Sequence, residues 1–113
     1  MRIRTSGLSE KAREHARDLA EKRIRRVLGR STRHVARLSI RLGDLNGPRG
    51  GVDKFCVIDL QLHKGPRVRV RARHERLAAA VQEAASRARR AVYRELGRNR
   101  RIDRRRVAEV REG

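Results

Sequence analysis

Arginine occupies every second position from Arg67 to Arg73, and a small apolar residue stands between each pair. Successive side chains of a β-strand point to opposite faces, so this spacing predicts one face that enters a core and one face of guanidinium groups. The outward side chains are those of Arg67, Arg69, Arg71 and Arg73. A guanidinium is permanently charged and donates a fork of hydrogen bonds that matches phosphate. The chemistry that the spacing predicts is therefore the binding of a polyanion.

Two segments upstream alternate in the same way, although less strictly. In residues 35–42 and 54–63 most apolar residues occupy alternate positions, and we expect both segments to be strands that share one apolar face. The positions expected to point inward are Ala36, Leu38, Ile40 and Leu42 in the first segment and Cys56, Ile58, Leu60 and Leu62 in the second. Arg37 and Arg41 fall on the outward face. The three segments together predict a sheet with one apolar and one positively charged face.

The residues that support catalysis or metal binding form no recognisable local arrangement. The four histidines, none of which has metal-ligand spacing, are His15, His34, His63 and His74. Asp44, Asn46 and Asp53 share a glycine-rich loop, but the alternation of ligands and the final glutamate of a calcium-binding loop are missing. Cys56 is the only cysteine, and we expect a buried, reduced thiol. We therefore expect no enzymatic activity, no cofactor, no metal and no small-molecule substrate.

Composition favours nucleic acid as the partner. The chain has 113 residues, with 32 Lys and Arg against 13 Asp and Glu and a formal net charge of +19. These values are typical of a single domain that binds a polyanion. No apolar run approaches the ~20 residues of a membrane span, and the N-terminus lacks the apolar segment of a signal peptide. We expect a monomeric protein of the cytoplasm that binds no membrane.

Helical spacing of apolar residues predicts one helix before the alternating segments and one after them. The first begins after Ser9, which can cap its N-terminus, and ends at Leu28. Gly29 can close it in a left-handed conformation. The second runs from about Glu75 to Leu96.

The chain after the second helix is expected to be a basic, flexible tail. Gly97 ends the helix, and residues 98–113 carry seven arginines against three acids without a clear period. The sequence thus predicts a folded unit of residues 1–97 and a tail of residues 98–113.

A short strand is also predicted over residues 2–5, with Ile3 pointing inward. The order of elements is then β-α-β-β-β-α. Both helices must cover the apolar face, because the other face carries the arginines. The sequence therefore predicts an α+β two-layer sandwich, with two helices on one face of a four-stranded mixed sheet.

Basic residues also gather on the predicted helices, away from their apolar stripes. Four arginines of the second helix fall within a sector of ~60° at about 100° per residue. They are Arg76, Arg87, Arg90 and Arg94. Glu83 is the one carboxylate of that sector, and Lys22 and Arg26 lie one turn apart on the first helix. We interpret these residues and the strand arginines as RNA contacts. Since Phe55 and Tyr93 are the only aromatic residues, the sheet has no stacking platform, and we expect contacts to phosphates and riboses.

The order of elements, Glu21-Lys22 late in the first helix, and the stretch from Arg49 to Cys56 resemble the ribosome hibernation promoting factors, also called ribosome-associated inhibitor or subunit-interface proteins. The second helix, from Ala79 onward, resembles theirs too. The resemblance covers about residues 1–97. The basic contact roles that it implies are those of Lys22, Arg26, Arg87, Arg90 and Arg94.

The resemblance implies a bacterial or organellar protein that binds rRNA of the small ribosomal subunit in the decoding region. There it would block the mRNA and tRNA sites during stress or stationary phase. The chain departs from the family near the start of the second helix, where Ala78 and Gln82 replace the usual tyrosine and aspartate. One alternative stays open, a general double-stranded RNA- or DNA-binding protein without ribosome specificity, since both functions require positive charge.

Overall fold

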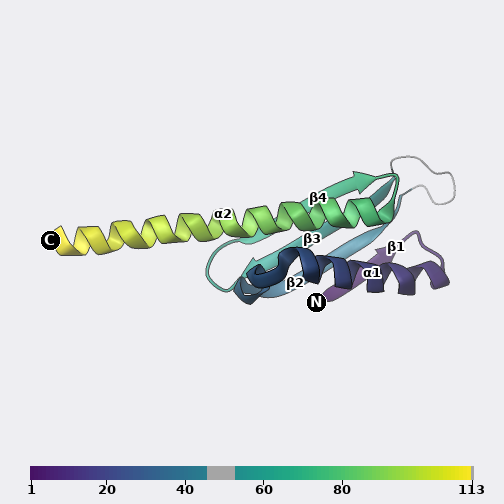
Figure 1. Ribbon diagram of the computed structural model, residues 1–113, viewed down its shortest axis with the longest axis horizontal. Helices are drawn as coiled ribbons and strands as arrows, with labels where there is room; N and C mark the ends of the chain where they lie inside the picture. Colours follow the sequence, from purple (N-terminus) through teal and green to yellow (C-terminus); the bar gives the residue numbers. More distant parts are fainter. Residues whose placement is uncertain (46–52, 113) are drawn as a thin grey trace.

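The computed structural model describes the backbone of residues 1–45 and 53–112 and the side chains of residues 1–45 and 53–98. The chain forms a four-stranded sheet, two long helices and a short 3-10 helix after the first of them. Figure 1 shows how the sheet and the long helices are arranged. The elements are β1 Arg2–Ser6, α1 Glu10–Leu28, η1 Gly29–His34, β2 Val35–Asp44, β3 Lys54–Leu62, β4 Arg67–His74 and α2 Leu77–Glu112. Most of the predicted glycine-rich loop, residues 46–52, lies outside the described residues.

The strands form one mixed sheet in the order β1-β2-β3-β4. β1 pairs with β2 in parallel, which requires the crossover through α1, and the other two pairs are antiparallel. Both helices lie on the same face of the sheet and pack against each other (Figure 1). The prediction of an α+β two-layer sandwich of β-α-β-β-β-α order is confirmed.

The core lies between the helices and the inward side chains of the strands. Its larger buried members are Ile24, Leu28, Ile40, Leu42, Cys56, Ile58, Leu60, Leu62, Val81 and Val92. α2 otherwise buries alanines, at Ala80, Ala84, Ala85 and Ala88, so short side chains separate this helix from the sheet. Cys56 is a buried free thiol, as expected, and burial raises its pKa to about 12.

The ends of α1 follow from its flanking residues. Ser9 is the N-cap, as predicted, and its Oγ accepts a hydrogen bond of 3.3 Å from the backbone N–H of Ala12. Gly29 ends the helix with a φ of 50°, in the region that favours glycine. The 3-10 helix that follows was not predicted; in it the Ser31 hydroxyl donates to the carbonyl of Leu28.

The inward position predicted for Ala36 is wrong. The pairing of β2 with β3 shifts between Val35, which lies opposite Leu62, and Arg37, which lies opposite Gln61. Ala36 is the extra residue of a β-bulge and is exposed, while Val35 packs against the core in its place. A bulge adds a residue to one strand only, so the alternation of a single segment does not reveal it.

The predicted end of the second helix at Leu96 is also wrong. α2 continues through Gly97 to Glu112, so the backbone of residues 98–112 is helical where a flexible tail was predicted. This stretch has no proline or glycine and is rich in arginine, a good helix former, so one glycine does not stop propagation. The far part of α2 projects beyond the sheet (Figure 1). The division into a folded unit of residues 1–97 and a separate tail stays a prediction. In the described part of the chain, no helix is long and apolar enough to cross a membrane.

Candidate nucleic-acid interface

The face of the sheet opposite the helices is lined with arginines. Strand pairing places outward side chains in rows across the sheet; one row is Arg2, Ser39, Asp59 and Arg69. We call this surface the arginine face. Its arginines, all exposed, are Arg2, Arg4, Arg37, Arg41, Arg67, Arg69, Arg71 and Arg73. Asp59 is the one carboxylate among the outward side chains of the described strand residues, so this face is strongly positive.

Arg2 and Arg4 belong to this face, although they were not predicted as site residues. They enter it because β1 lies parallel to β2, with Arg4 beside Arg41. The signal was present in the sequence: Arg2 and Arg4 alternate with Ile3 in the same way as the arginines of β4.

One arginine of this face is already engaged by a carboxylate. Arg69 Nε donates to Asp59 Oδ1 at 2.6 Å, and its Nη2 donates to Asp59 Oδ2 at 3.3 Å. The hydrogen bond to Asp59 raises the pKa of Arg69. Because this fork occupies the carboxylate, Arg69 is less available to phosphate than Arg67 or Arg71.

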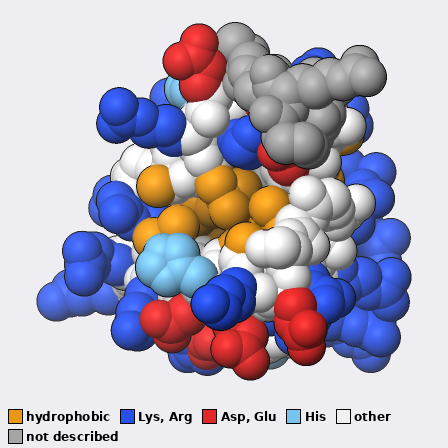
Figure 2. Space-filling view, turned by 90° about the vertical axis from the view of Figure 1, so that its right-hand side faces the viewer, with side chains coloured by type: hydrophobic (Ala, Val, Ile, Leu, Met, Phe, Trp, Pro, Cys, Tyr) orange, Lys and Arg blue, Asp and Glu red, His pale blue; other side chains and the backbone are white. Residues whose placement is uncertain are grey.

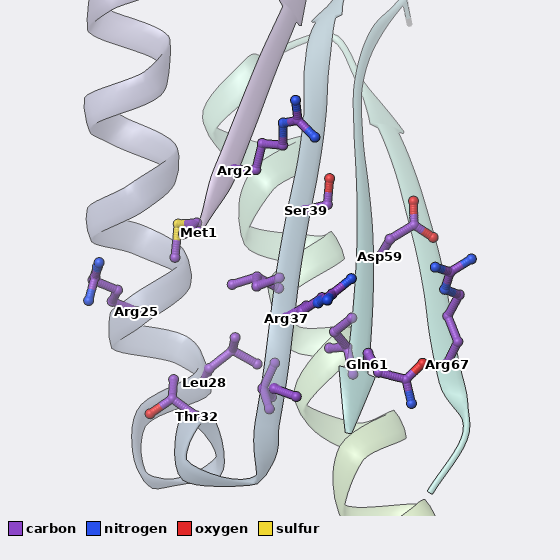
Figure 3. A pocket seen from close by; sticks show the side chains of 14 residues that line it. Met1, Arg2, Arg25, Leu28, Thr32, Arg37, Ser39, Asp59, Gln61 and Arg67 are labelled. Atoms are coloured by element: carbon purple, nitrogen blue, oxygen red, sulfur yellow. The ribbon is translucent and has the colours of Figure 1, made fainter. Parts of the chain in front are cut away.

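A pocket opens on the arginine face beside β2, where β1 has not yet begun. Figure 3 looks onto it, with α2 behind the sheet, and shows Arg2, Arg37 and Arg67 around it. β1 pairs only from Arg2, opposite Ser39, so residues 35–38 have no β1 partner. Its lining also includes Arg25 and Leu28 of α1 and Thr32 of η1, so the pocket lies at the open edge between the sheet and the helix layer, and its arginines outnumber its one carboxylate, Asp59.

Arg87 on α2 has two partners within the protein. Its Nη1 donates to the backbone carbonyl of Arg71, and its Nη2 pairs with Glu83, which also contacts His74. β4 is an edge strand of the sheet, and unpaired backbone groups of an edge require protection. Arg87 therefore covers part of that edge in addition to any contact with RNA.

The Glu83 carboxylate is held in its charged form by its neighbours. The hydrogen bond with His74 is the largest cause that lowers its pKa, and the charges of Arg87 and Arg90 lower it further against the effect of burial. Glu83 thus places a negative charge inside the basic sector of α2.

The other predicted residues of α2 are exposed. Arg90 and Arg94 lie within α2, whereas Arg76 precedes its first residue, Leu77, although the sequence predicted a start at about Glu75; all three side chains are exposed. Arg90 Nε makes a long hydrogen bond of 3.4 Å to the carbonyl of Ser86, one turn earlier in the helix. These side chains are available to phosphate oxygens.

The basic residues of α1 lie on the same side of the sheet as α2. Lys22 forms an exposed ion pair with Asp18, with Nζ and Oδ2 3.0 Å apart, and Arg26 is exposed. Between the helices, Arg23 Nη1 donates to Gln82 Oε1 at 3.1 Å. Gln82 stands where the resemblance leads one to expect an aspartate, and here it links the two helices.

Lys54, within the stretch that resembles the hibernation factors, binds two carboxylates. Its Nζ lies 2.8 Å from Asp44 Oδ2 and 3.2 Å from Oδ1 of Asp53, which is fully buried. The hydrogen bond to Asp44 is the main cause that raises the pKa of Lys54. The backbone N–H of Leu45 donates to the carbonyl of Asp53 at 3.0 Å. These bonds hold the facing ends of β2 and β3 together, a structural role. Residues 49–52 of the stretch lie outside the described residues.

The predicted contact residues therefore occupy two opposite faces of the protein. Lys22, Arg26, Arg76, Arg90 and Arg94 lie on the helix layer, and Arg67, Arg69, Arg71 and Arg73 lie on the arginine face. Arg87 reaches the backbone of β4, at the edge where these two faces meet. Figure 2 shows Lys and Arg side chains on both flanks of one end of the molecule, with hydrophobic side chains between them.

These features define a class of protein: a small, basic α+β domain with two helices on one side of a mixed sheet and arginines on the other. The chain belongs to the family described as Sigma 54 modulation protein / S30EA ribosomal protein, whose model matches residues 3–100. It is a family of ribosome-associated factors, and the resemblance to hibernation and subunit-interface proteins is confirmed.

Two of the solved structures that are similar to this chain are the following. A ribosomal subunit interface protein from Coxiella burnetii is 16% identical, has a TM-score of 0.61, and the match covers 83% of this chain and 96% of that one. The N-terminal domain of Thermus thermophilus Protein Y is 22% identical, with a TM-score of 0.55 and coverage of 82% and 93%. At these identities the likeness shows the fold. No curated protein matches the chain.

Proposed function

We propose that this protein is a cytoplasmic, bacterial translation inhibitor that binds small-subunit rRNA in the decoding region. It occupies the mRNA and tRNA sites during stress or stationary phase, acts as a monomer, and requires no cofactor or catalytic step. Family membership supports association with the ribosome. The particular site is supported by the shape and charge of the molecule.

The observation that carries the proposal is the presence of basic residues on two opposite faces. The described chain is elongated, with extents of 65 × 22 × 17 Å. A protein that binds the outside of a duplex needs one positive face, whereas a protein inserted between two walls of RNA gains counterion release at both. Arginines on the sheet and on the helices match a channel bounded by rRNA on two sides. Occupying such a channel excludes mRNA and tRNA by steric overlap alone.

The contacts on the helix layer are assigned to Lys22, Arg26, Arg76, Arg90 and Arg94, and those of the arginine face to Arg67, Arg71 and Arg73. Arg69 and Arg87 contribute less, because each pairs with a half-buried carboxylate, whereas the Lys22–Asp18 pair is exposed on both sides and therefore weak. To use either of them, phosphate must displace Asp59 or Glu83.

Two double charge reversals test the two faces separately. The helix variant is Arg90→Glu with Arg94→Glu, and the sheet variant is Arg67→Glu with Arg71→Glu. Each removes two exposed side chains that have no role in the core, so the fold is retained. If each arginine makes one charge-assisted contact of about 1.5 kcal/mol or more, each variant loses about 3 kcal/mol, over a hundredfold in affinity. The measurements are co-sedimentation with purified small subunits and inhibition of translation in vitro.

The matched control is Arg13→Glu with Arg17→Glu, which makes the same change of charge at exposed positions of α1 outside the predicted set. The control should retain most of the binding. Loss of binding in the helix variant alone would contradict insertion between two RNA walls and favour a one-sided RNA binder. If neither variant differs from the control, the proposed interface is wrong.

A further inference from the structure

Tyr93 is an exposed aromatic side chain within the basic surface of α2. Its relative exposure is 48%, although its neighbour Val92 is fully buried in the core. It is the only tyrosine of the chain, which has no tryptophan. Arg90 and Arg94 are exposed beside it on the same helix. A large ring left in solvent among arginines does not contribute to the core.

The surroundings of Tyr93 differ on its two sides along the helix. One turn earlier, the Arg89 guanidinium carbon lies 5.6 Å from the centroid of the ring, within the range of a cation–π contact. One turn later stands Gly97. A shallow hollow there is lined by Tyr93, Arg94, Glu95, Gly97 and Arg98, and Arg89 does not line it. The arginine and the hollow therefore lie on different sides of the tyrosine.

Gly97 has no packing reason to be glycine. A Cβ added at this position meets no atom within 4 Å, and the residue lies inside a continuous helix. Glycine there costs helix stability relative to alanine. Its effect in this structure is to leave the surface next to the Tyr93 ring open.

We propose that Tyr93 is a stacking platform for one unpaired RNA base, which enters the hollow above Gly97 while Arg94 and Arg98 contact the adjoining phosphates. The inference rests on the proposed function and deepens it, because it assigns to α2 a preference for single-stranded segments of the rRNA. Every base has a π-face, so stacking requires no particular sequence. Arg89 on the other side of the ring extends the stack by a cation–π contact. Arginine and tyrosine side by side match a nucleotide, which is at once anionic and aromatic.

The first experiment uses the wild-type protein, in which Tyr93 is the only source of tyrosine or tryptophan fluorescence. Three RNA probes are titrated: a short single-stranded oligoadenylate, the same strand with abasic riboses, and a blunt duplex of equal length. Stacking should quench Tyr93 fluorescence with the oligoadenylate only, because the other two probes retain phosphates but offer no unpaired base. Equal binding of the single strand and its abasic form without quenching would overturn the inference and leave the proposed function standing.

The second experiment compares variants for affinity to purified small subunits. Removing a stacked base contact, in Tyr93→Leu, should weaken binding about 5- to 150-fold, whereas Tyr93→Phe, which keeps the ring, should bind like the wild type. Gly97→Leu should weaken binding by filling the hollow, while Gly97→Ala controls for helix propensity. An affinity of Tyr93→Leu equal to the wild type would overturn the inference. If the wild type itself fails to bind small subunits, the proposed function is wrong. In that case the fluorescence titration alone tests whether a base stacks on Tyr93.

Discussion

Arginines that are equivalent in the sequence have different partners in the folded protein. Arg87 pairs with Glu83 and bonds to the β4 backbone, whereas Arg90 and Arg94, on the same helix sector, are exposed. A phosphate gains a full charge-assisted contact from Arg90, but at Arg87 it must first replace a carboxylate. Substitutions of Arg87 therefore report on stability as well as on binding.

The lowered pKa of Glu83 predicts that the stability of the protein depends on pH. Its pKa is lower in the folded state than the ordinary 4.5, chiefly because of the hydrogen bond with His74. A group whose pKa falls on folding contributes stability that is complete above its unfolded pKa and is lost as the pH falls through the folded pKa. Glu83→Gln should therefore lower the melting temperature at neutral pH, and the difference from wild type should shrink in acid. Thermal unfolding across a pH series, with Glu14→Gln as the exposed control, measures this. A difference that does not change with pH would count against the His74 contact.

The burial of Cys56 predicts that its thiol is unreactive in the native protein. Its side chain is fully buried, and burial raises its pKa to about 12, so the thiolate is nearly absent at neutral pH. An aromatic disulfide reagent should label it only as fast as the protein unfolds, and at once in urea. Fast labelling of the native protein would show that β3 opens locally.

α2 is one continuous helix with two different environments. From Leu77 to Leu96 it packs on the sheet and on α1, and beyond Gly97 it projects past the sheet (Figure 1). A helix segment without tertiary packing is only marginally stable in water. The backbone of the projecting part lies past the sheet, and residues 98–112 add seven arginines against three acids to the sequence.

Truncation after Gly97 tests whether residues 1–97 are the folded unit. Removing residues 98–113 should lower the helical circular dichroism signal but change the melting temperature only slightly, because Leu96 is the last α2 residue that packs against the core among those described. The comparison is a chain that ends at Ala91, which also loses the buried Val92 and should be less stable by about 1.5–3 kcal/mol. Loss of the cooperative transition on removing only residues 98–113 would show that the projecting segment docks on the domain.

At the scale of the whole molecule, the main feature is the distribution of positive charge. The chain carries a net charge of +19, and the described basic side chains lie on the outer surface of the helix layer and on the arginine face, with buried aliphatic side chains between them. Neighbouring arginines repel one another, and few acids offset them; Asp59 and Glu83 are two that do. A polyanion relieves this repulsion at both surfaces at once.

Binding to small subunits should consequently depend steeply on salt. If about 6–10 phosphates are neutralised, the affinity should fall about 10³–10⁵-fold between about 50 and 200 mM salt, through the loss of counterion release. Co-sedimentation across that range gives the slope, and the helix and sheet variants should each reduce it. A flat response would show that the contacts are not ionic and would contradict the role given to both faces.

Local patterns in the sequence predicted most of the helices and strands and the sign of the charge on their surfaces. The alternation at Arg67–Arg73 correctly placed arginine on one face of β4, and Ser9 and Gly29 correctly bounded α1. Such features depend on neighbours a few residues away, so they can be read without knowing the fold. The family resemblance likewise followed from short stretches and the order of elements.

Only the tertiary structure decided which residues meet. In the structure, Arg2 and Arg4 lie beside β2, and Ala36 is the extra residue of a bulge. Arg87 has two partners within the protein, and α2 continues past Gly97. Strand pairing and contacts between helix and strand join residues far apart in the chain, and no local period encodes them. The placement of the strand arginines and of the helix arginines on opposite sides of the core was predicted, because it follows from the apolar face of each element.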